Sequence, residues 1–276
     1  MISTLHCKPH PREFVRIVES FYAGLILAAG PSLAAEPSLG GKLLYAGQLD
    51  AKARALLVAA NIAGAASLAV SADAAAGKQA IRDGVIDFLV TSLDEALRIL
   101  KNEIRKQTTA AVCLALESKL NEADFTCLLL ERGVLPDLLP TRSAPAAEFA
   151  AFLSQVARPV VAIHPDDHQV LLDWSATSAP AQWMPKLDAL AYDCLCSDPN
   201  PAVVAPGSRW LRLASRYLGR MAPGSRLLRC DESTAERFQK RVWEQVASGE
   251  IGVNVEVSQI RAMTSQWYLI SPPKPL

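Results

Sequence analysis

The stretch Gly41-Lys-Leu-Leu-Tyr-Ala-Gly-Gln-Leu49 decides the fold. Its apolar run Lys42–Ala46 predicts a strand buried on both faces, because the run is continuous and does not alternate with polar residues. The segment Asp50–Ala63 has the alanine- and leucine-rich composition of a helix, and Gly64 provides its stop. Ser67–Val70 then predicts a second strand. A strand, a helix and a strand in this order indicate an α/β unit with a parallel sheet.

The same alternation continues along the chain. Ser92 and Glu95 form a capping box, which opens a predicted helix that runs to about Gln107. Two further predicted helices, each closed by a glycine, are Asn121–Arg132 and Ser233–Ser248. The remaining predicted strands are Asp87–Val90, Ala110–Leu116, Pro159–His164, Leu227–Arg229 and Gly252–Val257. This order predicts a mostly parallel sheet with helices on both faces.

Composition limits the compartment and the partners. The 28 basic and 28 acidic residues cancel, so no summed field would attract the protein to nucleic acid or to an anionic membrane. The apolar stretch Phe21–Ala35 is too short and too interrupted to span a bilayer. The six cysteines are scattered through a long chain, unlike a small secreted disulfide framework. We therefore expect a cytoplasmic protein with reduced thiols that binds neither nucleic acid nor a membrane.

Four segments between Ser38 and Ser143 resemble, in order and spacing, the NAD-binding domain of urocanase. They are Gly41–Leu49, the helix and strand that follow it to Val70, Ser92-Leu-Asp-Glu-Ala-Leu97 and Leu130-Glu-Arg-Gly-Val-Leu-Pro-Asp137. The resemblance implies an α/β fold with a Rossmann-like, mostly parallel sheet and helices on both faces, plus a smaller C-terminal α/β segment. It also implies NAD as the cofactor and urocanate hydration as the activity.

Three segments are expected from this resemblance and from the turn-rich region between Pro180 and Pro206. Residues 1–37 form an N-terminal helical segment, and residues 38–200 form the urocanase-like Rossmann domain. Residues 201–276 form an α/β appendage that either stands apart or belongs to the same domain. Its arginine run from Arg212 to Arg229, interleaved with aromatic residues, is interpreted as a solvated helix face in preference to a nucleic-acid or partner surface.

The glycine-rich turn of the family is largely replaced in this sequence. In the family, its backbone N–H groups and a helix N-terminus approach the pyrophosphate of NAD. Only Gly47 remains here, followed by Gln48, Leu49 and Asp50. The carboxylate of Asp50 would lie where a phosphate is needed, although Asp50 is also an ordinary helix N-cap. We expect no NAD binding in the manner of the family.

Other positions that the resemblance implies for the cofactor are altered too. Ser71 stands where the family has a glutamate suited to the ribose hydroxyls, and Asp73 follows two residues later. The stretch Thr141-Arg142-Ser143 replaces another cofactor-holding segment, and only Ser143 matches it. Thr91 and Ser92 complete the expected lining of the cleft.

The remaining cluster of reactive side chains is His164-Pro-Asp-Asp-His168. His164 ends a predicted strand, and Asp166, Asp167 and His168 follow in a loop. Two imidazoles and two carboxylates suit a divalent metal or acid–base chemistry. Acidic residues after a proline are also an ordinary helix start, and we favour this structural interpretation. No catalytic residue or metal ligand is therefore assigned.

Three functions are compatible with these patterns. The first, which we expect, is a non-catalytic urocanase-like protein that binds a small ligand or a protein partner. The second is a diverged NAD- or nucleotide-binding enzyme related to urocanate hydratase. The third is a structural module that forms a homodimer through an apolar helix face.

Overall fold

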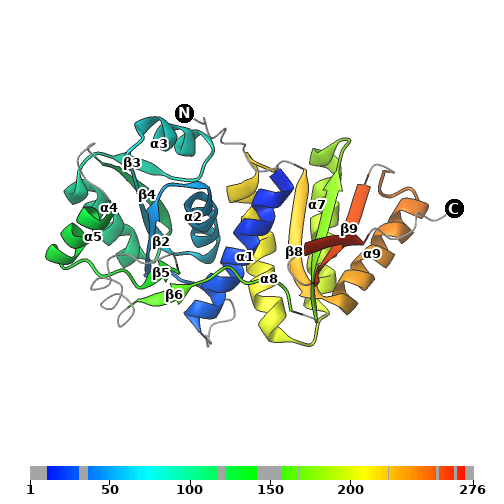
Figure 1. The fold of residues 1–276 in the computed structure, drawn as a ribbon. Coiled ribbons are helices and arrows are strands. Elements are labelled where there is room, and N and C mark those ends of the chain that lie inside the picture. The colour runs from blue at the N-terminus through cyan, green and yellow to red at the C-terminus, as the bar shows by residue number, and fades with distance from the viewer. Residues whose placement is uncertain are drawn as a thin grey trace.

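The computed structural model describes residues 11–30, 37–116, 122–141, 157–166, 168–222, 224–252, 255–263 and 266–270. Its strands form two sheets, with helices α1 and α8 in the middle of the molecule between them (Figure 1). The first sheet has six strands in the order β3-β4-β2-β1-β5-β6, and each pair of neighbours is parallel. These strands are β1 (Leu43–Gln48), β2 (Ala66–Ser71), β3 (Phe88–Val90), β4 (Ala110–Ala115), β5 (Leu138–Pro140) and β6 (Arg158–Val160).

Helices cover both faces of this sheet. On one face, α1 (Pro11–Ala29), α2 (Ala51–Ala63) and α3 (Ala74–Arg82) enclose a core that includes Leu44 and Ala69. On the other, α4 (Leu93–Lys106) and α5 (Glu122–Glu131) pack on Tyr45 and Leu68. Neighbouring residues of a strand thus contribute to opposite faces, and both faces are apolar, as in parallel sheets. The expected α/β fold, a mostly parallel Rossmann-like sheet with a smaller C-terminal segment, is confirmed.

The second sheet has four strands in the order β10-β9-β7-β8, and all its pairs are antiparallel. Its elements are β7 (Gln169–Ala176), α7 (Pro180–Cys196), α8 (Pro201–Leu218), β8 (Ser225–Asp231), α9 (Glu232–Ala247), β9 (Val255–Met263) and β10 (Gln266–Ile270). Because β7 lies between β8 and β9, the unit β8-α9-β9 joins two parallel strands across an antiparallel one, a split βαβ arrangement.

The second sheet begins earlier in the chain than the predicted boundary near residue 200, because its central strand is β7. The sequence pattern did not indicate β7, α7 or β5. In α7, Pro180 stands in the first turn, where a missing N–H costs little, while Pro185 lies inside the helix. Burial of Met184, Leu187 and other apolar residues at helical spacing outweighs the local effect of these prolines.

Several arginines in or just before the arginine run of the C-terminal segment bond to other parts of the protein. Arg209 donates to the carbonyl of Ile62 at 2.7 Å, and Arg220 donates to the carbonyl of Arg82 at 3.2 Å. Both carbonyls lie in the last turn of a helix of the first sheet, where a cation is favourable. Trp210 is buried, so it offers no aromatic surface to nucleic acid. Arg212, Arg216 and Arg220 are exposed along and just after α8, as a solvated helix face requires, whereas Arg226 and Arg229 lie in β8 and form ion pairs with Asp188 and Glu19.

In the part of the chain that the structure describes, no helix combines the length and the apolar character that a bilayer span requires.

Candidate functional site

The strand order has a switch point between β1 and β5, and we call the place outside the carboxyl ends of these two strands the crevice. From β1 the chain passes through α2 to β2 on one side, whereas β5 lies on the other side of β1. Ligands of open α/β sheets bind at such a switch point. Since Leu44 of β1 pairs with Leu138 of β5, the ends of the two strands bring Gly47 and Gln48 close to Thr141.

The turn that leaves β1 keeps its glycine for a conformational reason. Gly47 has φ +74°, a conformation that residues with side chains rarely adopt. It lies at an irregularity in the pairing with β2, where Tyr45 pairs with Leu68 and Gly47 pairs with Ala69. Leu49 is buried and returns to the sheet by donating its N–H to the carbonyl of Val70 at 2.8 Å.

Asp50 occupies the N-terminus of α2. Its carboxylate accepts the N–H of Ala53 at 2.8 Å, and its own N–H donates to the carbonyl of Gln48 at 2.8 Å. With the N–H of Leu49, these are donors that a dinucleotide-binding turn would direct at a pyrophosphate. They are bonded within the protein, and the carboxylate would repel a phosphate at this end of the helix. The residues of this turn therefore do not fit the pyrophosphate of NAD.

Ser71 and Asp73 lie at the end of β2, and both are used locally. Ser71 is buried, and its hydroxyl donates to the carbonyl of Asp73 at 2.9 Å and accepts the N–H of Asp73 at 3.2 Å. The Asp73 carboxylate caps α3 by accepting the N–H of Ala75 at 2.8 Å. These contacts are those of an ordinary turn and N-cap.

Thr91 and Ser92 do not join the crevice. They follow β3, which is the edge strand and is separated from β1 by β4 and β2. Strands lie about 4.8 Å apart, so β3 is roughly 14 Å from β1. Ser92 is the N-cap residue of α4, but its side chain forms no capping hydrogen bond, so the predicted capping box is wrong in its chemistry.

Thr141 is exposed at the end of β5, and its N–H donates to the carbonyl of Val160 at 2.9 Å. Arg142 and Ser143 lie outside the described residues. The structure thus brings Gly47, Gln48, Leu49, Asp50 and Thr141 to the switch point, and it holds Ser71 and Asp73 in their own turn.

The cluster from His164 to His168 has neither of its predicted settings. β6 ends at Val160, so His164 lies in an extended connection rather than at the end of a buried strand. Asp166 accepts the N–H of His168 at 3.0 Å in a turn, and β7 follows from Gln169 instead of a helix. The predicted helix start is therefore wrong. Asp167 lies outside the described residues.

Elsewhere in the described part of the chain, metal ligands do not gather either. Among the residues with described positions, no group of three or more His, Cys, Asp or Glu side chains has a geometry that would hold a metal ion. Burial raises the pKa of the Cys113 thiol to about 12, which leaves it un-ionised and unsuited to act as a nucleophile near neutral pH.

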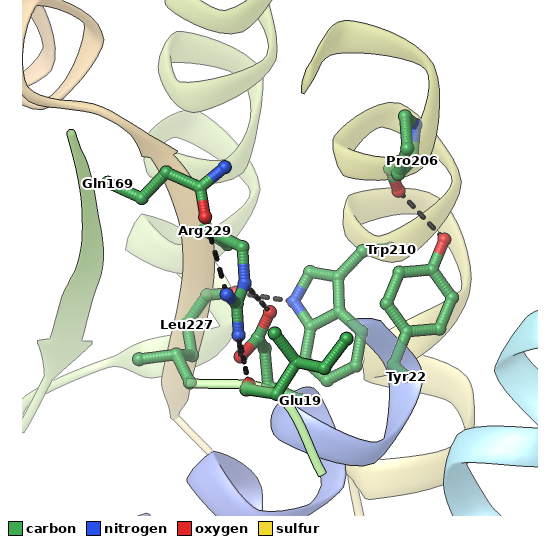
Figure 2. Close-up of polar contacts among 8 residues, drawn as sticks. Glu19, Tyr22, Gln169, Pro206, Trp210, Leu227 and Arg229 are labelled. Carbon is green, nitrogen blue, oxygen red and sulfur yellow. Dashed lines mark hydrogen bonds and ion pairs between the residues drawn. The ribbon is translucent and has the colours of Figure 1, made fainter. Parts of the chain in front are cut away.

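A buried ion pair that the sequence pattern did not indicate lies between the two sheets. Glu19 of α1 accepts two hydrogen bonds from Arg229 of β8, from Nε at 2.7 Å and from Nη2 at 2.8 Å. Figure 2 shows the guanidinium reaching this carboxylate on one side and Gln169 on another. Nη2 also donates to the carbonyl of Ile163 at 2.7 Å, in the connection between the sheets. Glu19 is 2% exposed, and the signal for it was an acid within an apolar helical stripe.

The aromatic contact beside this pair also joins α1 to the second sheet's elements. Tyr22 of α1 packs on Trp210 of α8 with ring centroids 5.2 Å apart, and its hydroxyl donates to the carbonyl of Pro206 at 2.9 Å. Trp210 in turn donates from Nε1 to the carbonyl of Leu227 in β8 (Figure 2). α1 is therefore bonded to both α8 and the sheet.

A known family matches the part of the chain that forms most of the first sheet. Residues 17–151 match the family model of the urocanase Rossmann-like domain. This part of the chain is a urocanase-family Rossmann-like domain. The match begins within α1 and extends past β5, so it is wider than the segments from Ser38 to Ser143 that carried the resemblance. Residues 17–29 of α1 thus fall within the match.

Proposed function

We propose that this protein is a urocanase-like Rossmann-fold binding protein without catalytic activity of its own. Its switch-point crevice takes a small ligand or a protein partner other than a dinucleotide. The observation that carries the proposal is the position of Asp50, whose carboxylate caps α2 where the family places a phosphate.

The local bonding at the end of β2 supports the same proposal. A ribose site there needs a carboxylate that is free to accept hydrogen bonds from the ribose hydroxyls. Rossmann dinucleotide sites use an Asp or Glu for this purpose. The hydroxyl of Ser71 and the carboxylate of Asp73 are instead bonded to backbone groups of their own loop. Neither half of a dinucleotide finds its usual partners at these positions.

A small hollow away from the switch point does not suit an organic ligand. It lies between α1, α8 and β8, lined by residues such as Val15, Leu218 and Leu227, and its cavity volume is about 10 Å³. A space of this size holds about one water molecule. The proposed binding function therefore relies on the crevice of the urocanase-like domain.

A thermal-shift titration of the full chain tests the proposal. We expect NAD⁺, NADH and ADP-ribose at millimolar concentration to leave Tm unchanged, and urocanate to show no loss of absorbance on incubation with NAD⁺ and protein. A ligand bound only by the native state raises Tm by mass action. A saturable rise with micromolar NAD⁺, or turnover of urocanate, would favour the diverged nucleotide-binding enzyme instead.

Two variants make this titration sharper. Asp50→Gly removes the carboxylate at the N-terminus of α2, and Asn200→Gly removes the matching N-cap side chain of α8, which lies outside the urocanase-like domain. If the Asp50 carboxylate blocks an anion site, ADP-ribose should raise the Tm of the Asp50→Gly variant only. The homodimer, the third function compatible with the sequence, is a separate hypothesis. Light scattering of the full chain tests it, and a strict monomer at high concentration would contradict it.

A further inference from the structure

A row of ion pairs joins α1 to one face of the second sheet. Its α1 residues are Arg12, Arg16 and Glu19. Successive members are about one helical turn apart, so their side chains lie on one side of the helix. We call this row the seam. Its pairs are Arg12–Glu256 at 2.8 Å, Arg16–Asp173 at 3.9 Å and Glu19–Arg229 at 2.7 Å.

The sheet residues of the seam share a face as well. Leu171, Asp173 and Ser175 are alternate residues of β7, and alternate residues of a strand point to the same side. Arg229 is paired in register with Leu171, and Glu256 with Ser175. The polar stripe of α1 therefore faces a polar stripe that crosses three strands of the second sheet.

Apart from the seam and its aromatic and apolar contacts with α8 and β8, the contacts of α1 fix it to the urocanase-like domain. It packs along α2, and Arg158 of β6 donates to the carbonyls of Ala28 and Ala29 at 2.7 and 3.0 Å. A methyl group at Gly24 would meet the carbonyl oxygen of Val161 at 1.8 Å, so the chain leaving β6 lies directly against the helix. α1 thus stays with the first domain if the second sheet moves.

The middle of the seam is incompletely paired. Nε of Arg16 is buried, and within the described residues it has no hydrogen-bond partner. Asp173 is 3% exposed and lies 3.9 Å from Arg16, beyond hydrogen-bond distance. Burial raises the pKa of Asp173, Arg12 and Arg16 oppose this shift, and Glu256 adds to it. The cost of removing these charges from water offsets much of their attraction, so the seam holds the second sheet on α1 only weakly.

We propose that the seam is a clasp, which closes the second sheet onto α1 and opens while both domains stay folded. The contacts of α8 with the urocanase-like domain survive this opening. Arg209 and Arg220 donate to the carbonyls of Ile62 and Arg82, and these bonds are not part of the seam. α8 then acts as the axis about which the second sheet swings. The clasp is a conformational device separate from the switch-point crevice.

Small-angle scattering and ¹⁵N NMR of the full chain test the clasp. The N–H of Ile163 donates to the carbonyl of Ser20 at 2.9 Å and reports on the seam, while the N–H groups of Leu49 and Ala176 report on the two sheets. We expect Glu19→Gln to shift the Ile163 signal toward its solvent-exposed position and leave the other two unchanged. The radius of gyration should rise above the roughly 19 Å of a compact chain of this length.

Two further variants decide between opening and general damage. The double variant Glu19→Arg, Arg229→Glu reverses the pair and should restore the wild-type radius and Ile163 signal. Asp188→Asn breaks an ion pair with Arg226 inside the second domain and should lower Tm without changing the radius. If Glu19→Gln keeps the wild-type radius and Ile163 signal, the clasp is refuted.

If Glu19→Gln unfolds the chain, the half-exposed end of the seam decides. Arg12→Gln removes the pair with Glu256, which is 63% exposed, and leaves the buried pair intact. It should shift the Ile163 signal in the same direction by a smaller amount. No shift in this variant, together with unfolding of the first, would show that the seam is only a structural interface.

Discussion

Gly24→Ala sets two opposing effects against each other at the crossing of α1 and the connection between the sheets. Alanine in a helix interior is favoured over glycine by about 1 kcal/mol. Against this, the added methyl group would lie 1.8 Å from the carbonyl oxygen of Val161, a backbone atom. Real Cβ atoms essentially never approach closer than 3.0 Å, so the connection must move away from the helix.

The displacement breaks identifiable bonds. The N–H of Ile163 loses the carbonyl of Ser20, and the carbonyl of Ile163 loses Nη2 of Arg229. A neutral hydrogen bond contributes about 1 kcal/mol and one to a charged group about 1.5–3 kcal/mol. The losses exceed the helix gain, so we expect the free energy of unfolding to fall by about 2 kcal/mol.

Urea denaturation followed by circular dichroism measures this change, with Gly249→Ala as the control. Gly249 has φ +79° and nothing within 4 Å of an added methyl group, so only backbone strain of about 1 kcal/mol is expected there. A Gly24→Ala variant as stable as the wild type, with the Ile163 amide unchanged, would refute the packing of the connection on α1.

Three other predictions concern single side chains. Asp50→Ala and Asp73→Ala each remove a helix N-cap and should each lower the free energy of unfolding by about 1 kcal/mol in urea. In native protein a disulfide reagent should label the exposed Cys127 and Cys196 and spare Cys113, whose pKa burial raises to about 12; rapid labelling of Cys113 would contradict this. Burial raises the pKa of Asp173 above its ordinary 3.8, so the folded state holds this proton more tightly than the unfolded chain. The resulting stabilisation of the folded state is complete below pH 3.8 and is lost as the pH rises through the raised pKa. Asp173→Asn should remove this part of the pH dependence of the urea unfolding midpoint.

The sequence predicted the parts of the fold that depend on local pattern. The apolar run after Gly41 and the alanine-rich helix to Gly64 became β1 and α2, because buried parallel strands and their crossover helices carry their own composition. β5 and β7 were missed for different reasons. β5 has only three residues, too few to show a pattern. In β7, Asp173 and Ser175 lie on a face that arginines of α1 cover, so these polar residues do not point to solvent as polar positions of a strand usually do.

Only the parts of the candidate site that depend on local sequence, within a single turn, could be predicted. Asp50 as the N-cap of α2 followed from its place before the helix, and the contact with Ala53 bears this out. The distance of Thr91 from the crevice depends on strand order, which places β4 between β2 and β3 and is not written in any local stretch. The pairing of Glu19 with Arg229 joins residues 210 positions apart, and charge type alone does not select such a partner.

Titration of ¹⁵N-labelled full-length protein with NAD⁺ tests the central claim most directly, through the amide signals of Leu49, Asp50 and Ala53. These three N–H groups are bonded within the protein, to Val70, Gln48 and the Asp50 carboxylate. We predict that their chemical shifts stay fixed up to millimolar NAD⁺. Saturable shifts confined to these amides would show that the turn still binds a dinucleotide and would contradict the proposed function.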